Sequence, residues 1–193
     1  NDIPLIEEIP QGFMSVRVGR RDMQWRSDKP STLIWVNALD NGDAANDVAY
    51  RDEMFELEAP FNQEPKSLLK TINRFHEVEW AKDDLAVVHD YWWTNRNTKT
   101  YFFDPSGNTQ EIRIVYDRNY QDKYSDPGLF INKKNQFGKL VLDIHDNCIF
   151  LSGEGHSENG QFPFVDKLNL NRLKQNGYIN LLILINSSKY FFP

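Results

Sequence analysis

The residues nearest to a catalytic motif surround a serine at position 157. The stretch Gly155-His-Ser157-Glu-Asn159 has the first glycine and the serine of a Gly-x-Ser-x-Gly nucleophile elbow, but asparagine replaces the second glycine. Such an elbow holds its serine between a strand and a helix. Phe162-Pro163 follows shortly after, and a proline there argues against a helix behind the serine. The stretch favours a solvated hairpin loop, and we predict no catalytic residue in this chain.

Histidine, cysteine and acidic residues give little indication of a metal site. No two of the four histidines have the i, i+4 spacing of helical metal ligands, and these histidines are His76, His89, His145 and His156. A zinc site would also need a cluster of cysteines or carboxylates, whereas Cys148 is the single cysteine and lies in an apolar run. We therefore predict a buried, inert thiol, no metal and no cofactor.

An acidic loop offers the one alternative to that prediction. Asp40-Asn-Gly-Asp43, together with Asp47, supplies the hard oxygen ligands that calcium takes. The spacing does not match an EF-hand loop, and Asp-Asn-Gly is also a strong turn signal. A polar hairpin loop is the favoured interpretation.

The aromatic group Tyr91-Trp92-Trp93 is the strongest candidate for a binding surface. Exposed aromatic side chains stack on sugars or peptides, and clusters of them mark binding sites. The group directly follows an apolar strand rather than a loop, which favours packing between sheets instead. Both interpretations stay open, and no ligand is assigned.

Composition indicates a folded globular protein and argues against several partners. The chain has 193 residues, of which 40% are hydrophobic, and a formal net charge of −6. No block of Lys and Arg recurs along the sequence, so we expect no nucleic-acid binding. The longest apolar stretch, Tyr178 to Ile185, is too short to span a bilayer. The chain does not open with the pattern of a signal peptide.

The segment from Phe75 to Asp117 contains one complete four-stranded unit. Short apolar runs at 85–90, 100–103 and 111–116 are separated by turn-forming stretches at 80–84, 95–98 and 104–107. β-Branched or aromatic runs between Asp, Asn, Pro and Gly are typical of antiparallel strands joined by tight turns. One such sheet cannot bury both of its faces, so we expect neighbouring sheets.

A similar pattern precedes this unit. We expect strands at 13–25, 32–36 and 53–58. The segment Lys66 to Glu77 is ambiguous because several of its apolar residues have helical spacing, and Pro65 suits a first helical turn. Strand is preferred there because of an internal repeat, which takes precedence over local propensity.

The repeat aligns the first segment on the second. Trp25 and Trp80 correspond at an interval of 55 positions, and Leu33 to Val36 correspond to Leu85 to Val88. A weaker third copy has strands at 139–144, 148–152 and 162–170, after an ordered loop at 118–134. Periods of about 40–50 residues with four strands each are the signature of propeller blades.

These observations predict an all-β chain that forms a partial, open β-propeller of about three to four four-stranded antiparallel blades. We divide it into an extended lead-in at 1–12, the propeller domain at 13–170 and an atypical apolar tail at 171–193. Because the open ring leaves apolar sheet faces and the edge-seeking run Tyr178 to Ile185, we also expect self-association.

Several motifs in the same order resemble the propeller portion of prolyl-oligopeptidase-family serine peptidases, in particular the branch with the glutamyl endopeptidases and their bacterial relatives. The resemblance covers about 9–170. It is carried by Trp25-Arg-Ser-Asp28-Lys-Pro30-Ser-Thr-Leu33, Asp40-Asn-Gly-Asp43, Tyr50-Arg-Asp52, Ala59-Pro-Phe61, Lys70-Thr71, Asp117-Arg118, Tyr124-Ser-Asp-Pro-Gly128 and Gly160-Gln-Phe-Pro-Phe-Val-Asp166.

The resemblance implies a propeller that caps an α/β-hydrolase domain and restricts entry to its Ser-Asp-His site. That hydrolase domain is absent from this chain, so a peptide substrate is expected only where the domain is supplied. The bacterial relatives suggest a periplasmic or extracellular location. A non-catalytic gating segment is the favoured function, and a free-standing binding module for a peptide or glycan is the alternative. An enzyme complete in these residues is disfavoured.

Overall fold

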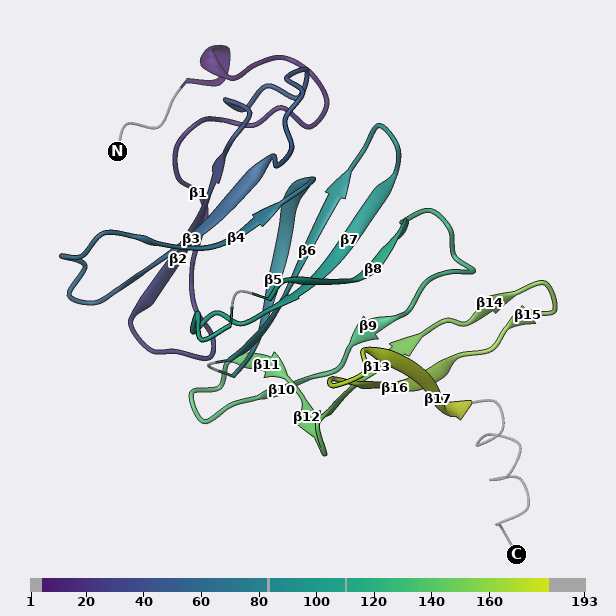
Figure 1. Cartoon of the computed structure of the whole chain (residues 1–193). Helices are drawn as coiled ribbons and strands as arrows, with labels where there is room; N and C mark the ends of the chain where they lie inside the picture. The colour runs from purple at the N-terminus through teal and green to yellow at the C-terminus, as the bar shows by residue number, and fades with distance from the viewer. Residues whose placement is uncertain (1–4, 83, 110, 181–193) are drawn as a thin grey trace, which may run out of the picture. The chain divides into compact units, whose positions relative to one another are not determined.

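The computed structural model describes residues 5–82, 84–109 and 111–180. Within these ranges the structure is all-β, as predicted, and the one helical segment is the short 3-10 helix η1 (Ile6–Glu8) (Figure 1). No helix in this part of the chain is long and apolar enough to cross a membrane. The chain divides into two compact units, 1–117 and 118 onward, which we describe separately.

The first unit opens with an antiparallel sheet that we call the first sheet. Its strands lie side by side in chain order, and they are β1 (Arg21–Trp25), β2 (Thr32–Ala38), β3 (Asp52–Glu58) and β4 (Lys66–Thr71). The prediction of a strand from Phe13 was wrong, because β1 begins only at Arg21. Met14 and Gly19 have φ values of 69° and 84°, which break an extended run, and Val16 N–H donates to Gly42 O instead of a strand neighbour.

The second sheet confirms the predicted four-stranded unit. Its strands, also in chain order, are β5 (Arg74–Lys82), β6 (Leu85–Trp92), β7 (Asn97–Phe103) and β8 (Arg113–Asn119). The expected turn at 80–84 was too long, because β5 continues to Lys82 opposite Leu85. The preference for strand over helix at 66–77 was right. A short break at Ile72 and Asn73 divides that segment between β4 and β5.

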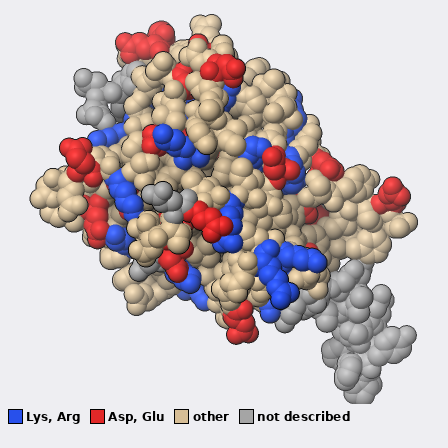
Figure 2. Space-filling model, in the orientation of Figure 1, with Lys and Arg blue, Asp and Glu red and all other residues tan. Residues whose placement is uncertain are grey.

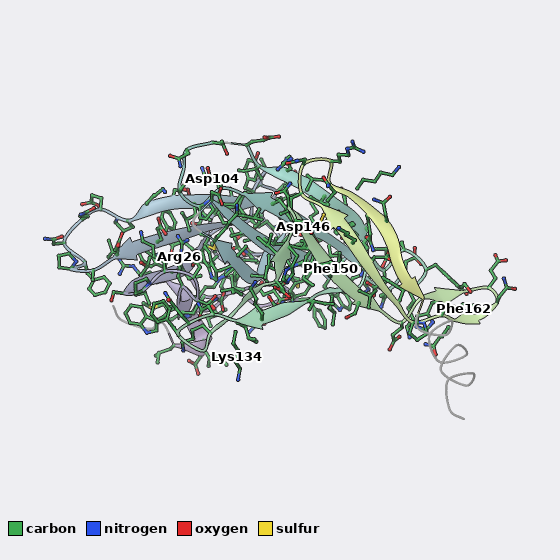
Figure 3. The ribbon with its side chains drawn as sticks, turned by 90° about the horizontal axis from the view of Figure 1, so that it is seen from below. Arg26, Asp104, Lys134, Asp146, Phe150 and Phe162 are labelled. Atoms are coloured by element: carbon green, nitrogen blue, oxygen red, sulfur yellow. The ribbon has the colours of Figure 1, made fainter. Side chains whose placement is uncertain are left out.

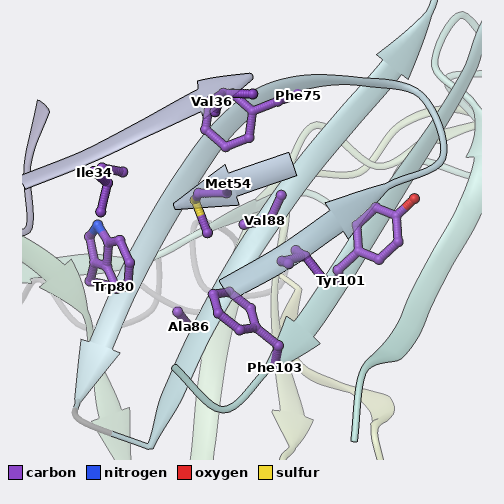
Figure 4. Packing of buried hydrophobic residues seen from close by; sticks show 10 residues of the cluster. Ile34, Val36, Met54, Phe75, Trp80, Ala86, Val88, Tyr101 and Phe103 are labelled. Atoms are coloured by element: carbon purple, nitrogen blue, oxygen red, sulfur yellow. The ribbon is translucent and has the colours of Figure 1, made fainter. Parts of the chain in front are cut away.

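The two sheets share one hydrophobic core. The first sheet contributes aliphatic side chains and methionine from one of its faces, namely Ile34, Val36, Met54 and Leu69. The second sheet contributes a more aromatic set, namely Phe75, Trp80, Ala86, Val88, Tyr101 and Phe103 (Figure 4). Burying a large apolar side chain stabilises a fold by about 1.5–3 kcal/mol, so this contact accounts for much of the stability of the unit.

Strand pairing refines the repeat. Trp25 pairs with Leu33 in the first sheet, and Trp80 pairs with Ala86 in the second, so the two tryptophans occupy equivalent positions as predicted. The alignment of Leu33 with Leu85 was one residue out of register, since Leu33 corresponds to Ala86. A one-residue slip matters because it moves a side chain to the other face of its sheet.

The second unit contains a sheet with the order β12-β13-β16-β17, and β9 also pairs with β13. Two hairpins, β10–β11 and β14–β15, accompany it. The strands are β9 (Leu129–Phe130), β10 (Asn132–Lys134), β11 (Leu140–Leu142), β12 (Ile144–His145), β13 (Cys148–Gly153), β14 (His156–Ser157), β15 (Gly160–Gln161), β16 (Phe164–Asn169) and β17 (Lys174–Asn180).

This sheet contains two of the three predicted strands of the third copy, which are β13 and β16. The strand predicted at 139–144 is mostly β11, which pairs with β10 in a separate hairpin. The stretch 118–134, expected to be a loop, instead holds the end of β8 and the short strands β9 and β10. β17 pairs with β16 and lies beyond Leu170, the predicted end of the propeller domain. Of the apolar tail predicted at 171–193, residues 181–193 lie outside the described residues.

Candidate functional site

Ser157 lies in a β-hairpin and not in a nucleophile elbow. β14 pairs with β15, and Phe162 N–H donates to Gly155 O at the base of the hairpin, where Figure 3 labels Phe162. The Ser157 hydroxyl donates to Gly160 O at 2.9 Å. The next element along the chain is the strand β16 rather than a helix. The hairpin interpretation of this stretch is therefore confirmed.

The four histidines are dispersed rather than gathered. His89 contacts Glu79 at 3.2 Å, His145 contacts Asp143 at 3.0 Å and His156 contacts Glu154 at 2.7 Å. His76 packs edge-on against Tyr91. Cys148 is a buried free thiol. Across the part of the chain that the structure describes, no group of three or more His, Cys, Asp or Glu residues has a metal-binding arrangement.

The acidic loop at 40–43 has its buried carboxylate bound by arginines. Arg74 donates to both carboxylate oxygens of Asp40, at 2.9 and 2.6 Å, and Arg51 contacts Asp40 at 3.0 Å. Gly42 N–H also donates to Asp40, at 3.0 Å. The Asp40 side chain is fully buried, so these contacts occupy the oxygens that a calcium ion would need.

The same network continues to the start of the second sheet. Arg74 contacts Asp52 at 3.1 Å, and Asp52 also forms an ion pair with Arg21 and accepts from Phe75 N–H at 2.7 Å. Arg74 Nε–H donates to Met14 O at 2.8 Å. Because every one of these charges is paired, the network positions the chain between β4 and β5 and holds the segment around Met14 in place.

The aromatic candidates make local contacts beside this network. Trp93 stacks on Phe13 with ring centroids 4.5 Å apart, and the Arg96 guanidinium lies 3.7 Å from the Trp93 ring. Arg51 lies 3.8 Å from the ring of Trp92. These contacts agree with a packing role, although Trp93 remains 40% exposed. The group also borders an open cleft of about 520 Å³, which Phe13, Arg21, Arg74, His76, Tyr91 and Trp93 help to line.

A second polar cluster lies inside the second sheet. The carboxylate of Asp90 accepts hydrogen bonds from Asn73 N–H at 2.9 Å, Lys99 N–H at 2.9 Å and the Tyr101 hydroxyl at 2.6 Å. Burial raises the pKa of Asp90 above its ordinary value, and these hydrogen bonds act in the opposite direction. Burial, followed by the nearby Asp90 charge, raises the pKa of Tyr101.

Taken together, the described side chains provide buried structural networks and a mixed polar and aromatic cleft. The Thr100 hydroxyl lies 3.2 Å from His89 Nδ1, and His89 Nε2 lies 3.2 Å from Glu79. Thr100 is only 6% exposed within strand β7, so this contact is part of the sheet and presents no open nucleophile. On the face shown in Figure 2, acidic and basic side chains are interspersed and neither sign forms a large patch. The sequence prediction missed Arg74, Asp52 and Asp90, because a single charged residue within a strand gives no periodic signal of its partners.

Sequence comparison with known proteins relates this chain to two plant proteins. No protein-family model matches the chain. The chain is 36% identical over 178 residues to the Arabidopsis thaliana protein named "Probable glutamyl endopeptidase, chloroplastic", and 36% identical over 177 residues to a protein of the same name from Oryza sativa subsp. japonica. Each alignment covers 88% of this chain but 18% and 19% of the two relatives.

This all-β chain is therefore homologous to a segment of serine peptidases of the prolyl oligopeptidase family. Within that family its relatives are the glutamyl endopeptidases, as the sequence motifs predicted. The chain spans about a fifth of the length of these curated relatives, and its described residues contain no α/β-hydrolase fold.

Proposed function

We propose that this chain is a β-propeller segment of a glutamyl endopeptidase-like protein, and that it limits which peptides reach a hydrolase domain elsewhere in that protein. The segment performs no hydrolysis itself. Selection by a propeller depends on a stable, correctly spaced wall of sheets, and it requires no nucleophile in the wall. The names of the two relatives and the all-β fold of the chain both support this proposal.

One observation carries the propeller part of the proposal, namely the way in which the first two sheets pack. The face of the first sheet with Ile34 and Val36 packs on the face of the second sheet with Trp80 and Ala86. By strand pairing, Trp80 and Ala86 correspond to Trp25 and Leu33, which lie on the opposite face of the first sheet. Each sheet thus presents a different face to its neighbour, which is how consecutive blades stack around a ring.

A chimera of the Arabidopsis relative tests the gating role. Residues 1–180 of this chain replace the matching segment, and kcat/KM is measured for a series of peptides of increasing length. We expect short peptides to be cleaved with higher kcat/KM than long ones, and Trp80→Ala, which loosens the contact between the sheets, to reduce that preference. Tyr124→Phe, at a 69% exposed residue, is the control. An unchanged length preference in a folded Trp80→Ala chimera would contradict gating.

The isolated chain tests the non-catalytic part of the proposal. A fluorophosphonate probe reacts covalently with activated serines, and we expect it to leave every serine of this chain unlabelled. Stoichiometric labelling of Ser157 or of another serine would show that the chain is itself a hydrolase. The periplasmic or extracellular location expected from the bacterial resemblance stays a prediction.

A further inference from the structure

The open cleft of about 520 Å³ lies where the segment around Met14 meets the starts of β1 and β5. Its lining combines aromatic side chains with the cations of Arg21 and Arg74 and the carboxylate of Asp22. All of the lining residues belong to the first unit, between positions 13 and 93. A concave site with an aromatic wall and a few convergent polar groups is typical of ligand binding.

The arginines at this cleft outnumber the buried carboxylates that hold them. Arg21 pairs with Asp52, Arg74 bridges Asp40 and Asp52, and Arg51 pairs with Asp40. Each guanidinium therefore has a partner, but two carboxylates serve three cations. Buried charges are costly unless they are fully compensated, so the surplus of one positive charge favours an anion nearby.

Arg21 is the least satisfied of these arginines. Its side chain is 8% exposed, and its Nε–H is buried without a hydrogen-bond partner among the described residues. Its ion pair with Asp52 uses Nη2. The carboxylate of Asp22 stays 3.6 Å from Nη1, which is too far for a hydrogen bond. An incompletely satisfied guanidinium in a cleft is a donor for a carboxylate ligand.

The backbone of β1 is deformed at the position where it borders the cleft. The pairing of β1 with β2 is interrupted between Arg21 and Gln24, and Asp22 has a φ of 53°. Neighbours in a regular strand point to opposite faces, yet Arg21 and Asp22 both line the cleft. Bulges and left-handed residues of this kind re-aim side chains and cluster at binding sites.

Aromatic side chains provide the apolar part of the wall. Phe13 is 74% exposed and Trp93 is 40% exposed, and their rings stack with centroids 4.5 Å apart. Tyr91 also borders the cleft, and His76 packs edge-on against it. Rings that hold one another in place offer apolar contact area with little further loss of conformational entropy. The wall therefore suits a ligand that carries an apolar group beside its charge.

We propose that this cleft binds a carboxylate carried on an apolar or aromatic group, which is the chemistry both of an arylalkanoic acid and of a peptide C-terminus with an aromatic last residue. The carboxylate accepts from Arg21 Nη1, and the apolar group lies against Phe13 and Trp93. A single surplus charge beside Asp22 suits a monoanion better than a phosphate dianion. The site does not depend on the proposed gating role.

Calorimetric titration of the chain with 3-phenylpropionate tests the proposal, and 3-phenylpropionamide is the matched neutral probe. Hydrogen bonds to charged groups are stronger than neutral ones, so we expect the acid to bind at least about tenfold more tightly than the amide. Equal binding of the two probes would mean that the cleft recognises only the apolar group, and it would overturn the proposal. Absence of binding by the acid would overturn it as well.

Three variants locate the binding in the cleft. Asp22→Asn removes a like charge from the rim, so it should strengthen binding of the acid about threefold and leave the amide unchanged. Glu158→Gln, at an exposed position in the second unit, makes the same change in net charge and should alter neither. Trp93→Ala should weaken both probes. An effect of Asp22→Asn no larger than that of Glu158→Gln would place the acid elsewhere and overturn the proposal.

Arg21→Gln is the most direct variant, and a folded form should lose the preference for acid over amide. Because Arg21 is buried, this variant can fail to fold, and Asp22→Asn then decides the proposal. Two short peptides that end in phenylalanine, one with a free C-terminus and one amidated, separate the two sources. Tighter binding of the free peptide than of 3-phenylpropionate assigns the site to peptide C-termini, and weaker binding assigns it to small acids.

Discussion

The first and second sheets of this chain have the same strand order, yet equivalent residues lie in different environments. Trp25 and Trp80 occupy the same repeat position, and 58% of one and 3% of the other is exposed. Neither local propensity nor pairing explains this contrast, since both tryptophans lie in first strands opposite an apolar residue. The difference teaches that burial of a repeat position depends on the neighbouring sheet and not on the position alone.

Replacing each of the two tryptophans by alanine should give the largest difference in stability between the two sheets. We expect Trp80→Ala to lower the free energy of unfolding by about 3–5 kcal/mol, because it leaves a cavity in the shared core. Trp25→Ala in the isolated chain should cost less than about 1 kcal/mol, because the side chain is mostly in water. Urea denaturation followed by circular dichroism measures both, and equal losses would contradict the comparison.

Removal of the arginine in the contact between the sheets should have the next largest effect. The Arg26 guanidinium lies 4.1 Å from the centre of the Trp80 ring. Arg26→Met leaves the carboxylate of Asp28 without its cation and leaves Glu56 with only Lys66, at 3.6 Å. Breaking a buried ion pair costs about 3 kcal/mol or more.

Lys29→Met is the control, because the pair of Lys29 with Glu58 is largely exposed and should contribute less than about 1 kcal/mol. If Arg26→Met lowers the free energy of unfolding no more than the control does, the arginine does not stabilise the contact between the two sheets.

The polar cluster inside the second sheet permits a milder test. Tyr101→Phe removes the hydroxyl that donates to Asp90 and accepts from Ile72 N–H, and we expect a loss of about 1.5–2 kcal/mol. The same change should raise the pKa of Asp90 further, because that hydrogen bond favours the carboxylate. NMR titration of Asp90 measures the shift, and Tyr124→Phe should leave it unchanged.

The smallest expected effect concerns a partly exposed ion pair at the edge of the second sheet. Hydrogen bonds from Lys99 and Asn97 lower the pKa of Asp117 below its ordinary value. Its folded pKa is then below its unfolded pKa, so the stabilisation is present above about pH 4 and is lost as the pH falls through the folded pKa.

Asp117→Asn should therefore lose less stability than the native chain on acidification from pH 5 to pH 2. The difference should be no more than about 0.5 kcal/mol, because the carboxylate is 52% exposed and screened by solvent. Urea denaturation at a series of pH values measures it. A larger acid sensitivity in the variant would mean that Lys99 pairs with another group.

Most of the strands were predictable because apolar alternation and turn residues are local signals. The Asp104-Pro-Ser-Gly107 turn and the run 85–90 show this, since each is contained in a few consecutive residues. The strand expected from Phe13 failed for a different reason. Its residues alternate correctly, but Arg74 and Gly42 bind their backbone from far along the chain.

For the candidate sites, the sequence mainly indicated which kinds of site to reject. The sequence places Ser157 in a hairpin context, and the structure agrees. It did not indicate that Asp40 would meet Arg51 and Arg74, because ion pairs between distant segments depend on how the sheets pack. The exposure of Trp25 could not be predicted either, because equivalent positions of a repeat give the same burial signal in a sequence.

The turn at Asp40–Asp43 also determines where this chain tolerates added sequence. A side chain at Gly42 would lie 2.0 Å from Val16 O, and the residue has a φ of 75°, so enlargement there would displace the neighbouring segment. A few residues later, Asp47 and Ala49 are exposed and lie outside any strand. An epitope tag or a fluorescent reporter is therefore best inserted between Asp47 and Ala49, where exposed loop backbone accommodates extra residues.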